Sequence, residues 1–188
     1  MALNAAWAVG VFAVSLLALG EAAAADGLRR VPETRIESFL LEKDSVAVKS
    51  FRDVGVVYGR NGGSLAVRVI SVFNIDEARV ARGVSIRVEN TEHEVMTSYV
   101  DEKELTELLD GLDYLTEFGP EYRPTDLVET KVETRGSFLF LRSSAWGEVE
   151  YLAMAGRAPS AAILLNQLGA LDLQDLLVDA QELIEKMP

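Results

Sequence analysis

Apolar and polar residues alternate along much of the chain with the two-residue period of β-strands. In the first half this alternation predicts four strands, over residues 45–58, 65–73, 84–89 and 94–100. The Asn61-Gly62 pair between the first two favours a tight hairpin turn, because both residues readily adopt positive φ values. The strand at 65–73 is apolar on both faces, so we expect it to be covered on both sides.

At Asp101 the period changes to the 3.6 residues of an α-helix. One apolar stripe is formed by Leu105, Leu108, Leu109, Leu112 and Leu115. Asp101 is placed to cap the helix N-terminus, with Glu104 three residues later as in a capping box. The Gly119-Pro120 pair is expected to end this helix.

The strand pattern then returns over residues 128–135, 138–141, 148–153 and 161–165. A second amphipathic helix follows, with Asp172 as its expected N-cap and Gly169 before it. Asp101 and Glu104 recur as Asp172 and Asp175 at an offset of 71, which leaves an internal duplication open. The sequence therefore predicts an α+β fold, with mainly antiparallel sheet in a β4-α-β4-α order and two amphipathic helices packed on the sheet.

The N-terminal segment is typical of a signal peptide. Residues 5–19 are apolar or small except for Ser15, and as a helix they would span about 22 Å, less than the roughly 30 Å of a bilayer core. The alanines at 22–25 suit cleavage after Ala25, or after Ala24. We expect a signal peptide at 1–25, a flexible leader at 26–35 and a single α+β domain at 36–188. The alternative is an uncleaved membrane anchor.

This organisation predicts a periplasmic or secreted protein with no membrane span after cleavage near Ala25. The chain of 188 residues has no cysteine and one histidine, and its net charge is −12. All the excess acidic charge of the mature chain lies in residues 101–121 and 172–188, which are the two expected helices. We interpret it as the solvated face of these helices; the alternative is a surface for a basic partner or Ca²⁺. The negative charge argues against nucleic acid as a partner.

Sequence motifs for catalysis are absent: there is no G-x-S-x-G, P-loop, G-x-G-x-x-G after a strand, H-E-x-x-H or S-x-x-K. His93, the only histidine, is expected as an exposed turn residue. No cofactor or metal site is predicted. These features favour a non-enzymatic module that binds an extracytoplasmic protein or glycan, with a small carboxylate-dependent hydrolase as the alternative. The candidate contact residues lie in expected loops: Arg60, Asn61, Trp146 and Arg157.

Two resemblances accompany these patterns. Residues 37–44, 46–49 and the helix at 101–115 resemble short secreted bacterial proteins of unassigned function, which implies no catalytic residues. The order of four strands, helix, four strands, helix resembles the Whirly-type fold, which implies binding of single-stranded nucleic acid. Here the strands are neutral in sum and the helices are acidic, so the basic groove that such binding requires is missing.

Overall fold

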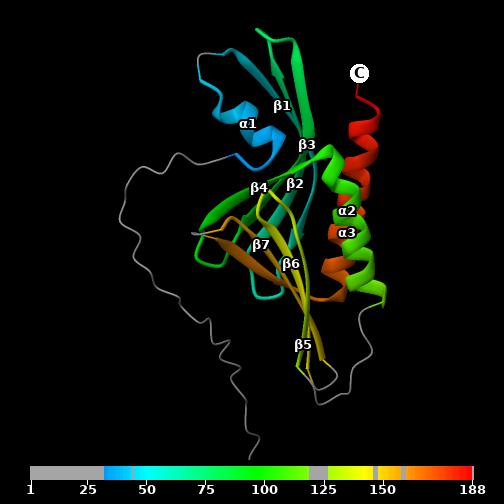
Figure 1. The fold of residues 1–188 in the computed structure, drawn as a ribbon. Helices are drawn as coiled ribbons and strands as arrows, with labels where there is room; N and C mark the ends of the chain where they lie inside the picture. Colours follow the sequence, from blue (N-terminus) through cyan, green and yellow to red (C-terminus); the bar gives the residue numbers. More distant parts are fainter. Residues whose placement is uncertain (1–31, 44, 119–126, 146–147, 158–159, 188) are drawn as a thin grey trace, which may run out of the picture. The chain divides into compact units, whose positions relative to one another are not determined.

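The computed structural model describes residues 32–43, 45–118, 127–145, 148–157 and 160–187. All of them belong to the unit Val31–Pro188. Two four-stranded antiparallel sheets follow one another along the chain, and each is succeeded by a helix (Figure 1). The predicted α+β class and the β4-α-β4-α order are confirmed.

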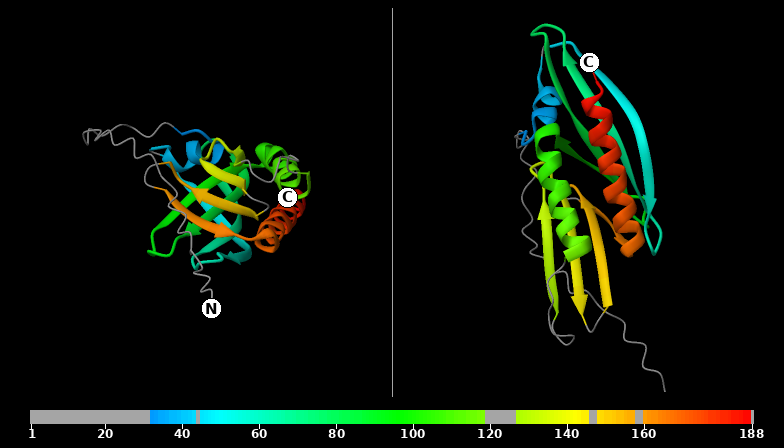
Figure 2. Two further views of the ribbon diagram at one scale, coloured as in Figure 1. Left: turned by 90° about the horizontal axis from the view of Figure 1, so that it is seen from below. Right: turned by 90° about the vertical axis from the view of Figure 1, so that its right-hand side faces the viewer.

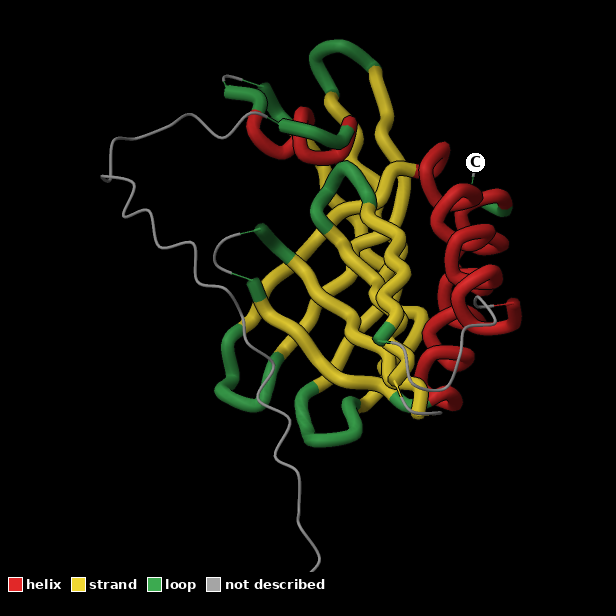
Figure 3. The backbone as a smooth tube through the Cα atoms, turned by 60° about the horizontal axis from the view of Figure 1, so that its bottom comes forward, coloured by secondary structure: helices red, strands yellow, loops and turns green. Residues whose placement is uncertain are grey.

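The first sheet has the order β1-β2-β3-β4, and the second has the order β5-β6-β7-β8. The strands of the first are β1 (Ala47–Tyr58), β2 (Ser64–Asn74), β3 (Arg79–Glu89) and β4 (Val95–Asp101). Those of the second are β5 (Val128–Glu133), β6 (Phe138–Ala145), β7 (Glu148–Ala155) and β8 (Ala161–Leu165). Figure 3 shows the strands of the two sheets crossing, with the long helices along one side.

Strand β2 is covered on both faces, as its sequence predicts. Leu65, Val67 and Val69 belong to the main core, which also holds buried residues of the second sheet and of both long helices. Ile70 and Val72 belong instead to a second cluster, completed by Ile36, Phe39 and Ala81. Apolar residues on both faces therefore reflect two separate layers packed on one strand.

The long helices are α2 (Glu102–Asp113), which continues into the π-helical η1 (Tyr114–Phe118), and α3 (Gln167–Glu185). They contact each other and lie side by side along the sheets (Figure 2). Their apolar stripes are buried, as predicted, through Leu105, Leu108, Leu112, Leu173, Leu177 and Ile184. Their acidic residues face outward for the most part, so the stripe and the charge occupy different sides.

The predicted start of α3 is wrong. The helix begins at Gln167, and its N-cap is Asn166, whose side chain accepts a hydrogen bond of 2.8 Å from the N–H of Gly169. Asp172 and Gly169 both lie inside the helix. The N-caps Asp101 and Asn166 are 65 residues apart, so the offset of 71 does not align the two helices.

A short helix, α1 (Arg35–Leu41), precedes the first sheet and was not predicted. Thr34 caps it, and the side chain of Glu37 completes a capping box with the N-cap backbone. The last two residues of the expected leader 26–35 thus belong to a capped helix, and Thr34 is buried. The predicted signal peptide, its cleavage point near Ala25 and leader residues 26–31 lie outside the described residues.

The start of β3 and the end of β6, at Ala145 instead of 141, also differ from the prediction. β3 begins at Arg79 within the expected polar connection, because residues 79–82 pair with β2. The first hairpin forms as predicted, with the loop 59–63 as its connection. Gly62 and Gly63 have the positive φ values, 99° and 77°. The loop also contacts the second sheet, since the Arg60 N–H donates to the Leu164 carbonyl at 2.8 Å.

The two sheets are also joined by hydrogen bonds near Ser98 of β4. The Ser98 hydroxyl donates to the Ser137 carbonyl at 2.9 Å and accepts from the Gly156 N–H at 3.1 Å. Ser98 is fully buried, and its hydroxyl is satisfied by the same two groups that also bond to each other, the Gly156 N–H and the Ser137 carbonyl, at 3.1 Å. β4 is thereby held against the turn that precedes β6 and the end of β7.

Candidate functional site

The edge strand β1 carries the largest set of exposed apolar side chains near one another in the described sequence. It pairs with β2 alone and forms one border of the first sheet. We call the following residues the β1 surface, each between 48% and 77% exposed: Val46, Val48, Phe51, Val56 and Tyr58. Exposed apolar patches of this kind commonly mark contact sites.

A β-bulge brings Phe51 onto the same face of β1 as Val56 and Tyr58, whereas Val46 and Val48, which precede the bulge, lie on the other face. The register with β2 shifts between Asp53 and Gly55, which inserts one residue into β1. Beyond the bulge Val57 pairs with Leu65 and is buried in the main core, so Val56 and Tyr58 lie on the opposite face. Apolar residues occupy nearly every position near the end of β1. One face of the strand there is therefore apolar and buried in the core, and the other face is apolar and exposed.

Arg60 and Asn61, two of the predicted contact residues, lie next to the end of β1. The guanidinium of Arg60 forms an ion pair of 2.9 Å with Glu150 of β7. Asn61 lines a shallow cavity between the loop 59–63 and the turn 90–94. Arg60 thus has a structural partner in the second sheet, while remaining substantially exposed.

Arg157 is not brought together with Arg60. Its side chain donates to the Ser137 hydroxyl at 2.8 Å and pairs with Glu33. Arg157 follows the end of β7, whereas the Arg60 partner Glu150 lies near its start, about 20 Å along the strand. Trp146 lies outside the described residues. The four predicted contact residues therefore do not form one site.

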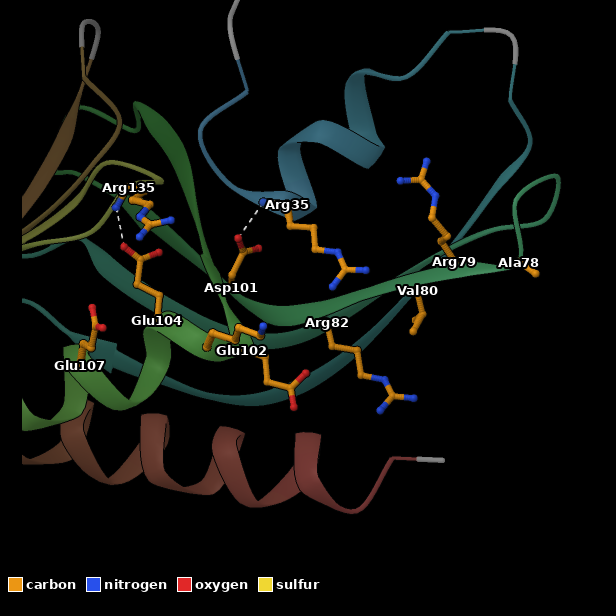
Figure 4. A pocket seen from close by; sticks show the side chains of 11 residues that line it. Arg35, Ala78, Arg79, Val80, Arg82, Asp101, Glu102, Glu104, Glu107 and Arg135 are labelled. Atoms are coloured by element: carbon orange, nitrogen blue, oxygen red, sulfur yellow. Dashed lines mark hydrogen bonds between the residues drawn. The ribbon is translucent and has the colours of Figure 1, made fainter.

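A cavity of about 620 Å³ opens between α1, β3 and the start of α2 (Figure 4). Its basic residues come from three elements and the turn before β6: Arg35, Arg79, Arg82, Lys103 and Arg135. Its acidic residues are Asp101, Glu102, Glu104 and Glu107. Figure 4 shows Arg35, Arg79 and Arg82 toward one end and Glu104, Glu107 and Arg135 toward the other.

Asp101 holds one wall of this cavity, in a role that differs from the prediction. Its carboxylate accepts hydrogen bonds from the N–H groups of Arg35 at 2.6 Å and Ile36 at 3.1 Å, at the N-terminus of α1. It sits at the N-cap position of α2 but makes no side-chain cap there. The predicted capping role of Asp101 in α2 is wrong, because α1 competes for the same carboxylate.

Glu104 likewise makes no capping box with Asp101. One carboxylate oxygen accepts a hydrogen bond of 2.7 Å from the Arg135 N–H, and Oε2 is buried with no hydrogen-bond partner. Burial raises the pKa of Glu104, and the hydrogen bond and charge of Arg135 oppose that effect. Glu104 therefore links α2 to the turn before β6. It is also an acidic residue of the cavity that has one buried carboxylate oxygen without a hydrogen-bond partner.

His93 and the acidic helices offer no obvious site. His93 lies in the turn between β3 and β4 with its side chain 85% exposed, 3.0 Å from Glu89. Among the described residues no group of three or more His, Cys, Asp or Glu side chains is arranged to hold a metal ion. Within the same residues, no helix is long and apolar enough to cross a membrane.

The chain matches no protein-family model, and a search among curated proteins finds no match. Two surfaces of the described chain could bind another molecule. The first is the exposed apolar edge at β1, and the second is the charged cavity beside β3. The alternation of apolar residues at 46, 48, 56 and 58 predicts a strand. It does not predict the β1 surface, which depends on the bulge and on the position of β1 at the border of the sheet.

Proposed function

We propose that this protein is a non-enzymatic binding module that acts outside the cytoplasm and holds a protein partner through the β1 surface. The observation that supports this most is the exposure of apolar side chains along an edge strand of twelve residues. Apolar residues on an unpaired edge favour association, since the strand also offers backbone N–H and C=O groups to another chain.

The edge of β1 has some of the features that normally protect such a strand, namely the bulge and charged side chains, and lacks others. It contains no proline, and its charged residues are Lys49, Arg52 and Asp53. Asp53 is already paired with Arg68 of β2 at 2.6 Å. A partner that added a strand beside β1 would cover the apolar side chains on either side of the bulge and satisfy the free backbone groups. The predicted signal peptide favours a partner outside the cytoplasm.

The proposal is tested by charged substitutions on β1. The paired change Phe51→Lys and Val56→Lys places two cations in the β1 surface, and Val178→Lys adds a cation on the exposed face of α3 as the control. Native size-exclusion chromatography of gentle extracts from cells that make the protein is the measurement. We expect the wild type and the control to elute in a complex and the β1 variant to elute as a free chain.

If the wild-type protein elutes as a monomer in these extracts, or if both variants keep the complex, the proposal is wrong. Circular dichroism of the purified variants shows whether each remains folded. A complex that contains only two copies of this chain would show self-association, and it would also contradict the proposal that the β1 surface binds a different protein.

Carboxylate-dependent hydrolysis is a second candidate function, favoured by one observation. Glu104 has a raised pKa and lines an open cavity together with Glu107, an arrangement that suits a general acid beside a second carboxylate. Chromogenic glycosides and esters incubated with the wild type and with Glu104→Gln test it. Hydrolysis that falls at least about a hundredfold in the variant supports an enzyme. Absence of turnover, or equal turnover by both proteins, removes this candidate.

A further inference from the structure

The first sheet has a second open edge, beside residues 79–82 of β3. The ladder between β3 and β4 runs from Gly83 and Asp101 to Glu89 and Val95. Residues 79–82 continue to pair with β2, but β4 has already ended and the chain turns into α2. In the described part of the chain, no strand therefore lies on the β4 side of these four residues. This position, which we call the β3 slot, coincides with the basic end of the 620 Å³ cavity.

Specific contacts join the elements that border the β3 slot, which are α1, β3 and the end of β4. The Asp101 carboxylate ties the start of α1 to the end of β4, as described above. On the sheet side, Phe39 of α1 packs in the second apolar cluster. The guanidinium of Arg79 lies over the Phe39 ring, 5.0 Å from its centroid, and that of Arg35 lies 5.9 Å away. The elements that border the slot, α1, β3 and the end of β4, are therefore joined to one another by these contacts.

The charges around the β3 slot favour an acidic occupant. Arg35 of α1 and Arg79 and Arg82 of β3 border it (Figure 4), and Lys103 of α2 lines the same cavity. Arg79 is already paired with Glu42 and Glu77, and Arg82 donates to the Met187 carbonyl. Arg35 and Lys103 are exposed and have no ion pair among the described residues.

The acidic residues of the cavity oppose this charge only in part. Asp101 is bonded to the start of α1, and Glu104 and Glu107 lie toward the end that holds Arg135 (Figure 4). Glu102 is the remaining carboxylate on the wall. A short ligand at the slot therefore meets Arg35 and Lys103, which have no ion pair among the described residues, beside the single wall carboxylate of Glu102, all within a Debye length of about 8–10 Å.

We infer that the β3 slot binds a short, extended, acidic segment of a partner protein, which adds to the sheet beside residues 79–82 in line with β4. Backbone hydrogen bonds to the β3 edge position the segment, and its carboxylates face Arg35 and Lys103. Val80 offers an apolar contact between the two basic positions. This inference is independent of the β1 surface and holds whether or not that surface binds a partner.

The test uses a fluorescein-labelled octapeptide of alternating glutamate and valine as the probe. A glutamate-proline peptide of the same length and charge, in which pairs of prolines alternate with pairs of glutamates, is a poor strand, since it lacks half of the N–H donors on either edge and its proline pairs favour polyproline II. Arg35→Glu and Lys103→Glu reverse single charges at the slot. Arg87→Glu is the matched control, because Arg87 is an exposed arginine on the part of β3 that pairs with β4.

Fluorescence anisotropy with the full chain gives the affinities. We expect the glutamate-valine peptide to bind, Arg35→Glu and Lys103→Glu each to weaken it at least about tenfold, and Arg87→Glu to leave it within about twofold. We expect the glutamate-proline peptide not to bind. Amide hydrogen exchange over residues 79–82 should slow when the probe is bound.

The inference is overturned if the glutamate-valine peptide does not bind, if the proline peptide binds equally well, or if Arg87→Glu weakens binding as much as Arg35→Glu does. Displacement of the probe by citrate at constant ionic strength would also overturn it, by showing that a small anion suffices. The Phe51→Lys and Val56→Lys variant should bind the probe as the wild type does, which separates this test from that of the β1 surface.

Discussion

At the scale of single residues, the sequence locates important side chains but not always their partners. Asp101 and Glu104 were expected to form a capping box within α2, and both prove important in other contacts. Asp101 caps α1, which lies 65 residues earlier in the chain, and Glu104 accepts a hydrogen bond from the turn before β6. A local pattern predicts a local contact, whereas the folded chain brings competing N–H groups to the same carboxylates.

The role of Asp101 can be tested by Asp101→Ala. We expect a loss of about 1–2 kcal/mol in the free energy of unfolding, because two N–H groups of α1 lose a charged acceptor. Urea unfolding measures the loss, with the exposed Asp110→Ala of α2 as the control. Hydrogen exchange should speed up in α1; faster exchange confined to the start of α2 would contradict this assignment.

Glu104 gives a prediction for pH. Burial raises the pKa of Glu104 in the folded protein above its ordinary value of 4.5. The stabilising contribution of the protonated side chain to the free energy of unfolding is therefore complete below pH 4.5, and it is lost as the pH rises through the higher pKa of the folded state. Glu104→Gln keeps an acceptor for the Arg135 N–H and removes the charge. We therefore expect the variant to gain stability relative to the wild type between about pH 4 and neutrality. Thermal unfolding across this range measures it, with Glu107→Gln as the control for loss of one charge. A difference that stays constant or falls with pH would contradict the prediction.

At the scale of elements, regular periodicity was the reliable guide. The apolar run of β2 predicted a strand covered on both faces, and the leucine stripe of α2 predicted a helix and its buried face. The misses share a different cause, because their boundaries depend on tertiary contacts. α1 is a helix of seven residues whose start is held by Asp101, and the first four residues of β3 form a strand by pairing with β2. α3 starts early because Asn166 caps it ahead of the acidic pattern.

The contact between the two sheets is most sensitive at Gly136. A Cβ atom at this position would overlap the backbone carbonyl of Tyr99 in β4, where neither chain can move independently. We expect Gly136→Ala to cost about 3 kcal/mol or more in unfolding free energy. The neighbouring Arg135→Ala keeps the backbone N–H that Glu104 needs and serves as the control. Equal melting temperatures for the two variants would show that the turn does not hold the sheets together.

At the scale of the whole molecule, the distribution of charge and apolar surface was only partly predictable. The acidic faces of both long helices follow from the sequence. The loop residues chosen as contacts did not form one site, since Arg60 and Arg157 lie at opposite ends of β7. The β1 surface and the β3 slot depend on which strand edges remain unpaired in the folded sheet. Local periodicity in the sequence does not determine the order of the strands.

Export from the cytoplasm is a prediction about the whole chain. We expect the intact mass of the soluble protein, made from its own start codon, to correspond to a chain that begins at Asp26 or Ala25. Mass spectrometry of soluble and membrane fractions measures this. An uncleaved chain in the membrane fraction would identify residues 5–19 as an anchor, and an uncleaved soluble chain would contradict export.

The most direct test of the central claim is site-specific photo-cross-linking from the β1 surface. A benzophenone amino acid is placed at Tyr58, the most exposed residue of that surface, and in a second protein at Val178 on α3. After irradiation of cells that make either protein, we predict a covalent adduct of one defined mass from position 58 and none from position 178. No adduct from position 58, or the same adducts from both positions, would contradict a binding function of β1.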